Sequence, residues 1–306
     1  METVVFTGGG TGGHIYPGLA VAFRLLSLRP CRIVWIASSS VLDRGIVEKA
    51  GIEFLAIPSG KLRRYFSLKN ISDIFRIAAG FFASRKILKR LRPSFVFSKG
   101  GFVSVPPCAA ARSLGIPVFT HESDYSPGLA TRINTRFAQT VFVAYEDTKR
   151  SLGVSKNTRI LVSGNPVREV FRKANAARGR SFTGAGDADR ILLVLGGSQG
   201  ARQVNELIVS CLDALCKDWF IVHQTGAEAE GIPPAKKNYL PLPFIHEELP
   251  DILAASSLVL GRSGAGTIWE AAAAGKPLLL IPLCGSGTRG DQVENAAMVE
   301  KAEAGI

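Results

Sequence analysis

The sequence predicts an α/β protein of two domains, each built on a parallel β-sheet covered by helices. Apolar runs of strand length alternate with helical segments along most of the chain, as a parallel sheet requires. Several of these runs end in a glycine-rich turn that opens a helix, and the same order begins again near residue 191. The 306 residues suffice for two ordinary domains, and 46% apolar with 20% charged residues is typical of a globular chain. We therefore expect one domain at residues 1–168 and another at 169–306.

The first strand is a β-branched run at 3–5, and it leads into the glycine turn 8–13. A helix follows, and we expect Pro17 in its first turn, where the N–H that proline lacks has no intrahelical partner. The exposed N–H groups and the helix dipole at such a turn attract a phosphate or a polarised hydroxyl. His14 lies at this turn, either as a helix-capping polar residue or as a functional group.

Gly8, Gly10 and Gly13 also match the dinucleotide-binding pattern GxGxxG, although any tight strand-to-helix turn favours glycine. A dinucleotide site needs an acidic residue at the end of the second strand to hold the ribose. That strand, 32–37, ends in three serines, and Asp43 already belongs to the next element. The sequence therefore argues against a nicotinamide cofactor. The elements expected next are a helix at 41–50 and a strand at 53–57.

The segment 61–92 carries ten Lys or Arg residues and a single acid, Asp73. Its apolar residues recur at helical spacing, which is what an ordinary helix packed on a sheet shows. Several Phe side chains among basic residues also fit an amphipathic surface that rests on an anionic membrane leaflet. The residues expected at that surface are Phe75, Phe81, Phe82, Arg85 and Lys86.

A fourth strand at 94–98 ends in a second glycine turn, 99–102, which leads into a helix of small residues closed by Gly115. The next strand, 118–120, delivers the HESD cluster, 121–124, to its C-terminal end. Ligands of open α/β sheets bind at that edge. We therefore expect the two glycine turns and the HESD cluster to meet at one site.

After a strand at 159–162, the segment 172–190 has few large apolar residues, and we expect it to be a linker or a surface excursion. The elements expected in the second half are a strand at 191–195, a glycine turn and a helix from about 201 to 216, and strands at 220–223, 258–260 and 278–281. Between the last two strands, a Gly/Ser turn leads into a helix with Glu270. That carboxylate is either a partner of the helix dipole or an acceptor for both hydroxyls of a ribose. Two such domains predict a ligand cleft between them.

The composition indicates in which cellular compartment the protein works and which kinds of partner it binds. Five scattered cysteines without a CxxC pair indicate a reduced, cytosolic protein with no zinc site. The sequence has no run of about 18 apolar residues, and its start lacks the pattern of a signal peptide. A net charge of +12 favours an anionic partner, which by charge alone could be nucleic acid, an acidic membrane surface or a phosphorylated substrate. No motif of a nucleic-acid module is present, so we expect no nucleic-acid partner.

Seven motifs stand in one order over nearly the whole chain, namely GGGTGGHIYPG, SKGGFVSVP, HESD, SGNPVR, GGSQGAR, RSGAGTIWE and DQVENA. Together they closely resemble the MurG family of bacterial peptidoglycan glycosyltransferases. The resemblance implies a GT-B fold, with two Rossmann-like domains whose parallel sheets face a central cleft. It also implies a further strand and helices after Ile306, so we expect the second domain to be truncated at its C-terminus.

The resemblance implies an inverting, metal-independent hexosyl transfer without a cofactor. N-acetylglucosamine would move from UDP-N-acetylglucosamine to the C4 hydroxyl of lipid I, which is undecaprenyl-pyrophosphoryl-MurNAc-pentapeptide, and form lipid II. The first domain would bind the acceptor and the second the UDP-sugar. The protein would bind peripherally to the anionic surface of the bacterial inner membrane, at its cytoplasmic face.

The resemblance also implies roles for single residues. An inverting displacement needs a base for the acceptor proton, and we expect His14 in that role, since an unperturbed pKa of about 6.5 leaves imidazole largely neutral at pH 7. Glu122 is the alternative base. The residues implied in donor binding are Thr11, Gly12, Gly13, Asp124, Arg168, Ser198, Ile245, Ala265, Gly266, Thr267, Glu270 and Gln292. The residues implied in acceptor binding are Gly10, Gly100, Gly101 and His121, the last as an orienting group. Asp124 and Asp291 stand where some family members carry Asn and Gln.

Two other functions stay open at the level of sequence. One is a different GT-B enzyme, such as a diacylglycerol glycosyltransferase or a UDP-sugar epimerase, which would use the same kind of glycine turns. The other is a truncated, non-catalytic nucleotide-binding module at a membrane. Turnover of a UDP-sugar with and without each acceptor separates the three.

Overall fold

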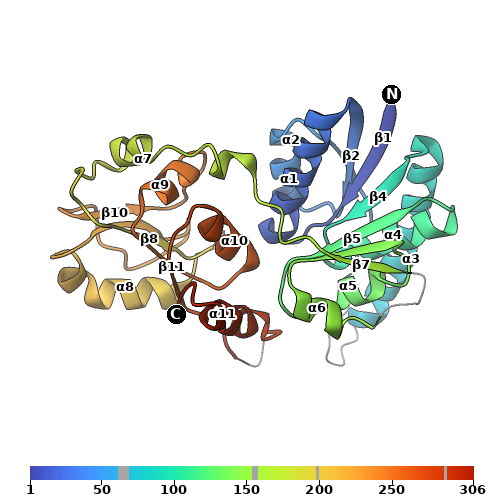
Figure 1. The fold of residues 1–306 in the computed structure, drawn as a ribbon. Coiled ribbons are helices and arrows are strands. Elements are labelled where there is room, and N and C mark those ends of the chain that lie inside the picture. Colours follow the sequence, from blue (N-terminus) through green and yellow to red (C-terminus); the bar gives the residue numbers. More distant parts are fainter. Residues whose placement is uncertain (61–68, 154–157, 198–199, 286–287) are drawn as a thin grey trace. The chain divides into compact units, whose positions relative to one another are not determined.

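The computed structural model describes residues 1–60, 69–153, 158–197, 200–285 and 288–306. It divides into two compact units, Met1–Pro166 and Val167–Ile306 (Figure 1). The division falls two residues before the boundary that we expected after Arg168. Each unit has its own parallel sheet and its own apolar core, so each is described by itself.

In the described part of the first unit, the sheet has seven strands in the order β3-β2-β1-β4-β5-β6-β7, and neighbouring strands are parallel. Phe6 on β1 lies opposite Trp35 on β2 and Phe97 on β4, and its ring packs on both of theirs. The strands are β1 (Glu2–Thr7), β2 (Cys31–Ala37), β3 (Glu53–Ala56), β4 (Phe95–Ser98), β5 (Val118–Glu122), β6 (Thr140–Val143) and β7 (Arg159–Val162).

Helices cover both faces of this sheet (Figure 1). Val4 and Phe6 on β1 join one core cluster with residues of α1, whereas Val5 joins a second cluster with residues of α3 and α4. Because both faces are buried, the inner strands are rich in apolar residues, which is the pattern that predicted β1, β2 and β4. The helices are α1 (Gly12–Leu28), α2 (Val41–Lys49), α3 (Lys69–Leu91), the short 3-10 helix η1 (Phe102–Ser104), α4 (Val105–Ser113), α5 (Leu129–Asn134) and α6 (Glu146–Ser151).

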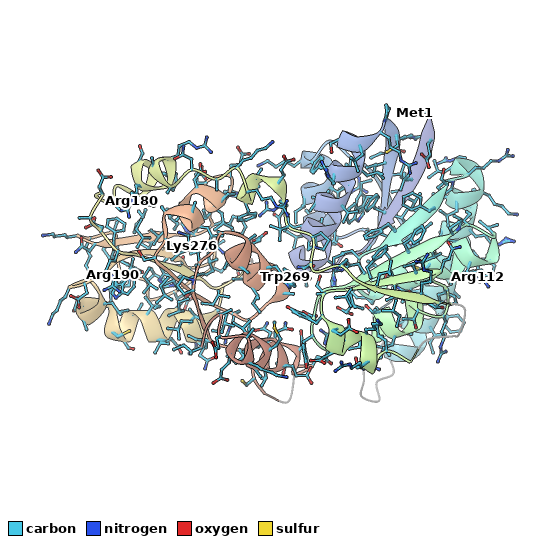
Figure 2. All side chains as sticks on the ribbon, in the orientation of Figure 1. Met1, Arg112, Arg180, Arg190, Trp269 and Lys276 are labelled. Carbon is cyan, nitrogen blue, oxygen red and sulfur yellow. The ribbon has the colours of Figure 1, made fainter. Side chains whose placement is uncertain are left out.

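The described part of the second unit has a five-stranded parallel sheet in the order β10-β9-β8-β11-β12. Leu193 on β8 packs with residues of α9, α10 and α11, and Leu192 packs on the other face with residues of α8. Side chains fill the space between these helices and the sheet (Figure 2). The elements are η2 (Glu169–Phe171), α7 (Ala176–Thr183), β8 (Ile191–Leu195), α8 (Arg202–Leu215), β9 (Phe220–Gln224), β10 (Tyr239–Leu242), α9 (Leu249–Ala255), β11 (Leu258–Gly261), α10 (Ala265–Ala273), β12 (Leu278–Leu280) and α11 (Asp291–Lys301).

Both sheets reverse their strand order beside their first strand. The reversal lies between β1 and β4 in the first unit and between β8 and β11 in the second. The crevice outside the carboxyl ends of two such strands is where open α/β sheets bind ligands. The glycine turns that follow β1, β4, β8 and β11 therefore all lie at a position suited to a ligand.

Two local expectations are wrong. The first helix begins at Gly12, so Pro17 lies in its second turn, and His14 occupies the first turn instead. The segment 172–190 is not a linker, because it contains α7, which packs against α9. A Cβ on Gly179 would lie 2.2 Å from the carbonyl oxygen of Asp251, and Arg178 donates to the Asp251 carboxylate at 2.7 Å. These contacts join residues more than 70 apart in sequence, so composition alone did not indicate the helix.

Candidate functional site

The candidate site of the first unit begins where two glycine turns touch. The N–H of Lys99 donates to the carbonyl oxygen of Thr7 at 2.8 Å, which ties the turn after β4 to the end of β1. A Cβ on Gly101 would lie 2.5 Å from the carbonyl oxygen of Gly9, and Gly101 has a left-handed φ of 76°. Glycine is therefore required where the two backbones meet. The predicted residues that these turns bring together are Gly10, Thr11, Gly12, Gly13, Gly100 and Gly101.

His14 lies half-buried in the first turn of α1, with its Nδ1 3.2 Å from the carbonyl oxygen of Lys99. Because a carbonyl oxygen only accepts, Nδ1 carries the hydrogen and donates it, which leaves the lone pair of the neutral ring on Nε2. Burial and then the Lys99 ammonium lower the pKa of His14, and the carboxylates of Glu122 and Asp124 partly oppose them. A neutral imidazole with a lone pair on Nε2 can accept a proton from a hydroxyl group.

The HESD cluster continues this site from the end of β5. Glu122 is buried, and its carboxylate accepts the N–H groups of Ser123 at 2.9 Å, Asp124 at 3.1 Å and Gly128 at 2.9 Å. These bonds hold the loop that follows the strand. The buried His121 donates from Nε2 to the carbonyl oxygen of Gly164 at 2.9 Å, and burial lowers its pKa well below the ordinary value. His121 is thus a neutral ring in a fixed orientation.

Lys99 is a site residue that the sequence analysis missed. Its side chain is 2% exposed, and Nζ donates to Ser123 Oγ at 2.5 Å. That hydroxyl in turn donates to Asn165 Oδ1 at 2.5 Å. Burial lowers the pKa of Lys99 to about 8, against the opposing effect of nearby carboxylates. The sequence signal that could have found Lys99 is a lysine directly after an apolar strand. That strand is β4, which lies beside β1 where the strand order reverses.

Asp43 is a second missed residue. It is fully buried at the start of α2, and its Oδ2 accepts the N–H of Gly10 at 2.8 Å. Burial raises the pKa of this carboxyl above its ordinary value. The sequence shows a Ser40-x-x-Asp43 pattern, and Ser40 does cap α2 by accepting the N–H of Asp43. The contact with Gly10 joins residues 33 apart, so the capping pattern could not reveal it.

The second unit brings two predicted donor-binding residues together. Arg168 Nη2 donates to Glu270 Oε1 at 3.2 Å, although the residues are 102 apart in sequence. Glu270 lies in the second turn of α10, with 21% of its side chain exposed. Burial raises the pKa of Glu270, and Arg168 opposes that shift. The Arg168 guanidinium also lies 4.8 Å from the centre of the Phe171 ring.

The start of α10 lies beside this ion pair, directly after the turn that follows β11. The first N–H groups of a helix have no partners within the helix, and an anion is stabilised there. The Ser263 hydroxyl in this turn donates to the carbonyl oxygen of Gln292 at 2.7 Å, and Gln292 Oε1 accepts the N–H of Leu283 at 2.9 Å. The start of α11 is thereby attached to the turn. The predicted residues at this position are Ala265, Gly266, Thr267 and Gln292.

Ile245 lies buried after β10, and its N–H donates to Gln224 Oε1 at 3.1 Å. Gln224 Nε2 donates to the carbonyl oxygen of Gly197 at 3.1 Å, so one side chain links Ile245 to the third glycine turn. Because its N–H is used within the protein, Ile245 has its carbonyl oxygen to offer to a ligand. The predicted Ser198 lies outside the described residues.

Comparison with known proteins identifies the family. Models of the glycosyltransferase family 28 N-terminal and C-terminal domains match residues 4–143 and 191–306. A UDP-N-acetylglucosamine--N-acetylmuramyl-(pentapeptide) pyrophosphoryl-undecaprenol N-acetylglucosamine transferase of Treponema denticola is 51% identical over 98% of this chain and 82% of its own. The crystal structure of MurG from Acinetobacter baumannii has a TM-score of 0.72 at 26% identity and covers all of this chain and 85% of its own. The chain belongs to the MurG family.

A further relative has the same name and matches this chain over most of its own length. A Clostridium botulinum (strain Hall) protein with the name of the Treponema denticola transferase is 42% identical over 99% of this chain and 84% of its own. The two Rossmann-like units of this MurG family member form the GT-B fold that the motifs predicted.

Helix α3 carries the residues that we expected at a membrane. Phe75 and Phe82 are 72% and 67% exposed, and Lys86, later on the same helix, is also exposed. Phe81 is half-buried and packs against the core cluster, with its ring edge-on to Phe82 at 5.3 Å. Phe81 is therefore less accessible than the other two. Among the described helices of this MurG family member, none is both long and apolar enough to cross a membrane.

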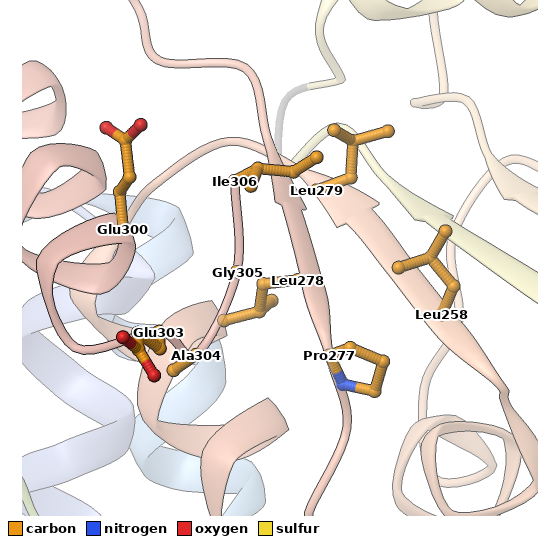
Figure 3. A pocket seen from close by; sticks show the side chains of 9 residues that line it. All are labelled: Leu258, Pro277, Leu278, Leu279, Glu300, Glu303, Ala304, Gly305 and Ile306. Atoms are coloured by element: carbon orange, nitrogen blue, oxygen red, sulfur yellow. The ribbon is translucent and has the colours of Figure 1, made fainter.

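A pocket of about 550 Å³ lies beside β12 in the second unit (Figure 3). Leucine side chains line it together with Ile306, which pairs with the edge strand by donating its N–H to the carbonyl oxygen of Leu278 at 3.0 Å. None of the residues implied by the MurG motifs lines this pocket. We therefore give it no part in the candidate site.

Proposed function

We propose that this chain transfers N-acetylglucosamine from UDP-N-acetylglucosamine to the C4 hydroxyl of lipid I, and so forms lipid II for peptidoglycan synthesis. The observation that carries the proposal is the 51% identity, over 98% of this chain, to a relative named for that transfer. The positions of His14 in the first unit and of the Arg168–Glu270 pair in the second support it.

The second unit is proposed as the donor site. Glu270 accepts the two ribose hydroxyls, and Arg168 beside it lies near the diphosphate, where a guanidinium binds well. The diphosphate rests on the first N–H groups of α10, which stabilise the charge that develops on departing UDP. The carbonyl oxygen of Ile245 accepts from uracil. The further proposed donor contacts are Thr11, Gly12, Gly13, Asp124, Ser198, Ala265, Gly266, Thr267 and Gln292.

His14 is proposed as the general base. Its Nε2 accepts the proton of the C4 hydroxyl while that oxygen attacks the anomeric carbon of the donor. The bond from the anomeric carbon to the UDP oxygen breaks, UDP leaves with the electron pair, and attack opposite the leaving group inverts the configuration from α to β. Glu122 is less suited to this role because its oxygens already accept three backbone N–H groups. The proposed acceptor contacts are Gly10, Gly100, Gly101 and the orienting His121.

The protein is proposed to act at the cytoplasmic face of the inner membrane, where a lipid-linked acceptor is found. Exposed Phe75 and Phe82 would enter the leaflet, and the basic residues of α3 would attract its anionic headgroups. The net charge of +12 supports the same placement. Arg85 and Lys86 are the basic residues proposed to lie nearest the membrane surface. Phe81 is proposed to pack behind them, against the core of the first unit.

A transfer assay with three acceptor conditions tests the proposed function. The 306-residue chain is incubated with labelled UDP-N-acetylglucosamine and a lipid I analogue, diacylglycerol, or no acceptor. We expect a labelled disaccharide-lipid with the lipid I analogue alone. Transfer to diacylglycerol would indicate a different glycosyltransferase, and conversion of the UDP-sugar without acceptor would indicate an epimerase. Binding of UDP with no turnover under any condition would contradict the proposal.

A further inference from the structure

Lys99 contributes a buried ammonium group that the proposed reaction does not itself use. Lys99 is among the largest fully buried side chains of the described residues. An ammonium group loses its hydration when it is buried, so it persists only where neighbouring groups compensate for the loss. The groups around Lys99 therefore indicate what it does.

Lys99 contacts the candidate site through its main chain and its side chain. Its N–H donates to the carbonyl oxygen of Thr7 at 2.8 Å, which fixes its position against the end of β1. Its carbonyl oxygen accepts from His14 Nδ1 at 3.2 Å, which fixes the ring with Nε2 on the side away from that carbonyl oxygen. Its Nζ donates to Ser123, whose hydroxyl donates to Asn165. One residue thus joins both glycine turns to the HESD cluster.

We propose that Lys99 is a positioning residue for the base: its carbonyl oxygen orients His14, and its buried ammonium anchors Ser123 and balances the carboxylates around the base. The inference rests on the proposed function only in naming His14 as the base. The contacts of Lys99 themselves lie within the first unit and involve no substrate.

The charges that face His14 come from three other elements of the first unit. Lys99 after β4 disfavours the protonated ring, whereas Glu122 and Asp124 at the end of β5 favour it. Asp43 on α2 also interacts with His14, and Lys99 further disfavours protonation of His121. Without the ammonium, no positive charge of the described residues would offset the carboxylates, and burial alone would oppose protonation of His14. The imidazolium would then form at higher pH, and the base would be lost by protonation nearer neutrality.

The sign of the effect of Lys99 on the pKa of His14 follows from the pH ranges in which Lys99 and His14 titrate. The pKa of Lys99 is lowered to about 8, so its ammonium is charged at neutral and acidic pH, where protonation of His14 takes place. In that range it lowers the pKa of His14 and keeps the ring neutral. Removal of the charge should therefore raise the pKa of His14.

A histidine titration by NMR tests this coupling without substrate. The chain has four histidines, so the ring signals of ¹³C-labelled protein are few, and the signal absent from His14→Gln is that of His14. In Lys99→Met the His14 midpoint should move to higher pH, and in Asp124→Asn it should move to lower pH. The matched control Lys217→Met removes an exposed lysine of the second unit and should leave the midpoint unchanged.

Lys99→Gln is a second variant for the case that Lys99→Met does not fold. The glutamine side chain lacks the charge but keeps an N–H donor for Ser123, so we expect this variant to fold. An unchanged His14 midpoint in either folded variant overturns the proposal.

In transfer assays, the acid limb of the kcat/KM profile should move to higher pH in parallel, with about tenfold lower kcat/KM on that limb for each pH unit of displacement. A uniform loss of rate with an unmoved limb would mean that Lys99 is only structural. A moved NMR midpoint in a protein with no transferase activity would reject the proposed function and leave the Lys99–His14 coupling standing.

Discussion

Single side chains of the candidate site have their charges set by burial and by one or two neighbours. His14 is neutral because burial and Lys99 both oppose its protonation. Glu270 is half-buried in the second turn of α10, where burial raises the pKa of its carboxyl and Arg168 opposes that shift. Each of these groups is therefore open to a test by a substitution that changes its charge and little else.

Replacement of His14 by Gln should remove the proton acceptor and keep the size of the side chain. We expect kcat to fall by about 10²- to 10⁴-fold, which is the usual contribution of a general base. UDP affinity should stay within error, because the proposed donor contacts of the ribose and uracil lie in the second unit. Steady-state kinetics with a titration of UDP measure both quantities, and an unchanged kcat would exclude His14 as the base.

The pH dependence of the wild-type chain follows from the same residue. The protonated ring cannot accept a proton, so kcat/KM should fall as the pH drops through the pKa of His14. Because burial and Lys99 lower that pKa, the midpoint of the fall should lie below about pH 6.5, the ordinary pKa of an exposed histidine. A profile whose acid limb lies above this range would contradict the assignment.

Glu270→Gln should weaken UDP by roughly 10- to 100-fold, since hydrogen bonds to a charged group contribute about 1.5–3 kcal/mol. The neutral amide accepts less strongly from the ribose and leaves Arg168 without its carboxylate. Isothermal titration with UDP measures the change. Glu206→Gln, on the exposed face of α8, is the matched control and should bind UDP as the wild type does. Equal affinities for all three proteins would remove Glu270 from the donor site.

The sequence motifs led to the residues whose chemistry is local, and they missed the residues that act through contacts with distant segments. Gly10, Gly101 and Glu270 stand in local patterns whose chemistry can be read from a few neighbours. Lys99 and Asp43 act through contacts with residues 24 and 33 positions away, which no local pattern contains. Their roles became visible only when the fold had placed the segments together.

At the scale of helices and strands, buried parallel strands were predictable because both of their faces are apolar. The buried strands β1, β2 and β8 lie within a residue or two of their expected positions, and so does the largely exposed edge strand β7. The short β6 and β10 escaped notice, the latter because Pro241 argues against a strand unless the strand is at an edge, as β10 is. Helix α7 escaped notice because it packs against α9, and contacts such as the Arg178–Asp251 ion pair join residues far apart in sequence.

Helix α3 gives a prediction for the membrane. Phe75→Ser with Phe82→Ser should reduce partition into anionic vesicles by at least about tenfold, since burial of one such side chain contributes about 1.5–3 kcal/mol. Both rings are exposed, so the fold should keep its unfolding temperature. Vesicle co-sedimentation measures the partition, and Val293→Ser, which replaces an exposed apolar residue of α11, is the control. Wild-type partition of the double variant would place the membrane contact elsewhere.

At the scale of the whole molecule, the two units have separate sheets and separate cores, so a ligand of one unit should protect that unit first. UDP at 100 times its Kd should stabilise the second unit by about 2.7 kcal/mol. Hydrogen exchange read by mass spectrometry should then slow in α10 and in the turn after β8. It should not slow in β1 or β4. Protection that appears in the first unit alone would contradict the assignment of the donor to residues 167–306.

The central claim is that a hydroxyl deprotonated by His14 displaces UDP in a single step. The most direct measurement is the configuration of the new glycosidic bond, read from the anomeric proton coupling in the NMR spectrum of the product formed with a lipid I analogue. The account predicts a β-linked N-acetylglucosamine. An α-linked product, or release of free sugar and UDP without a new bond, would contradict it.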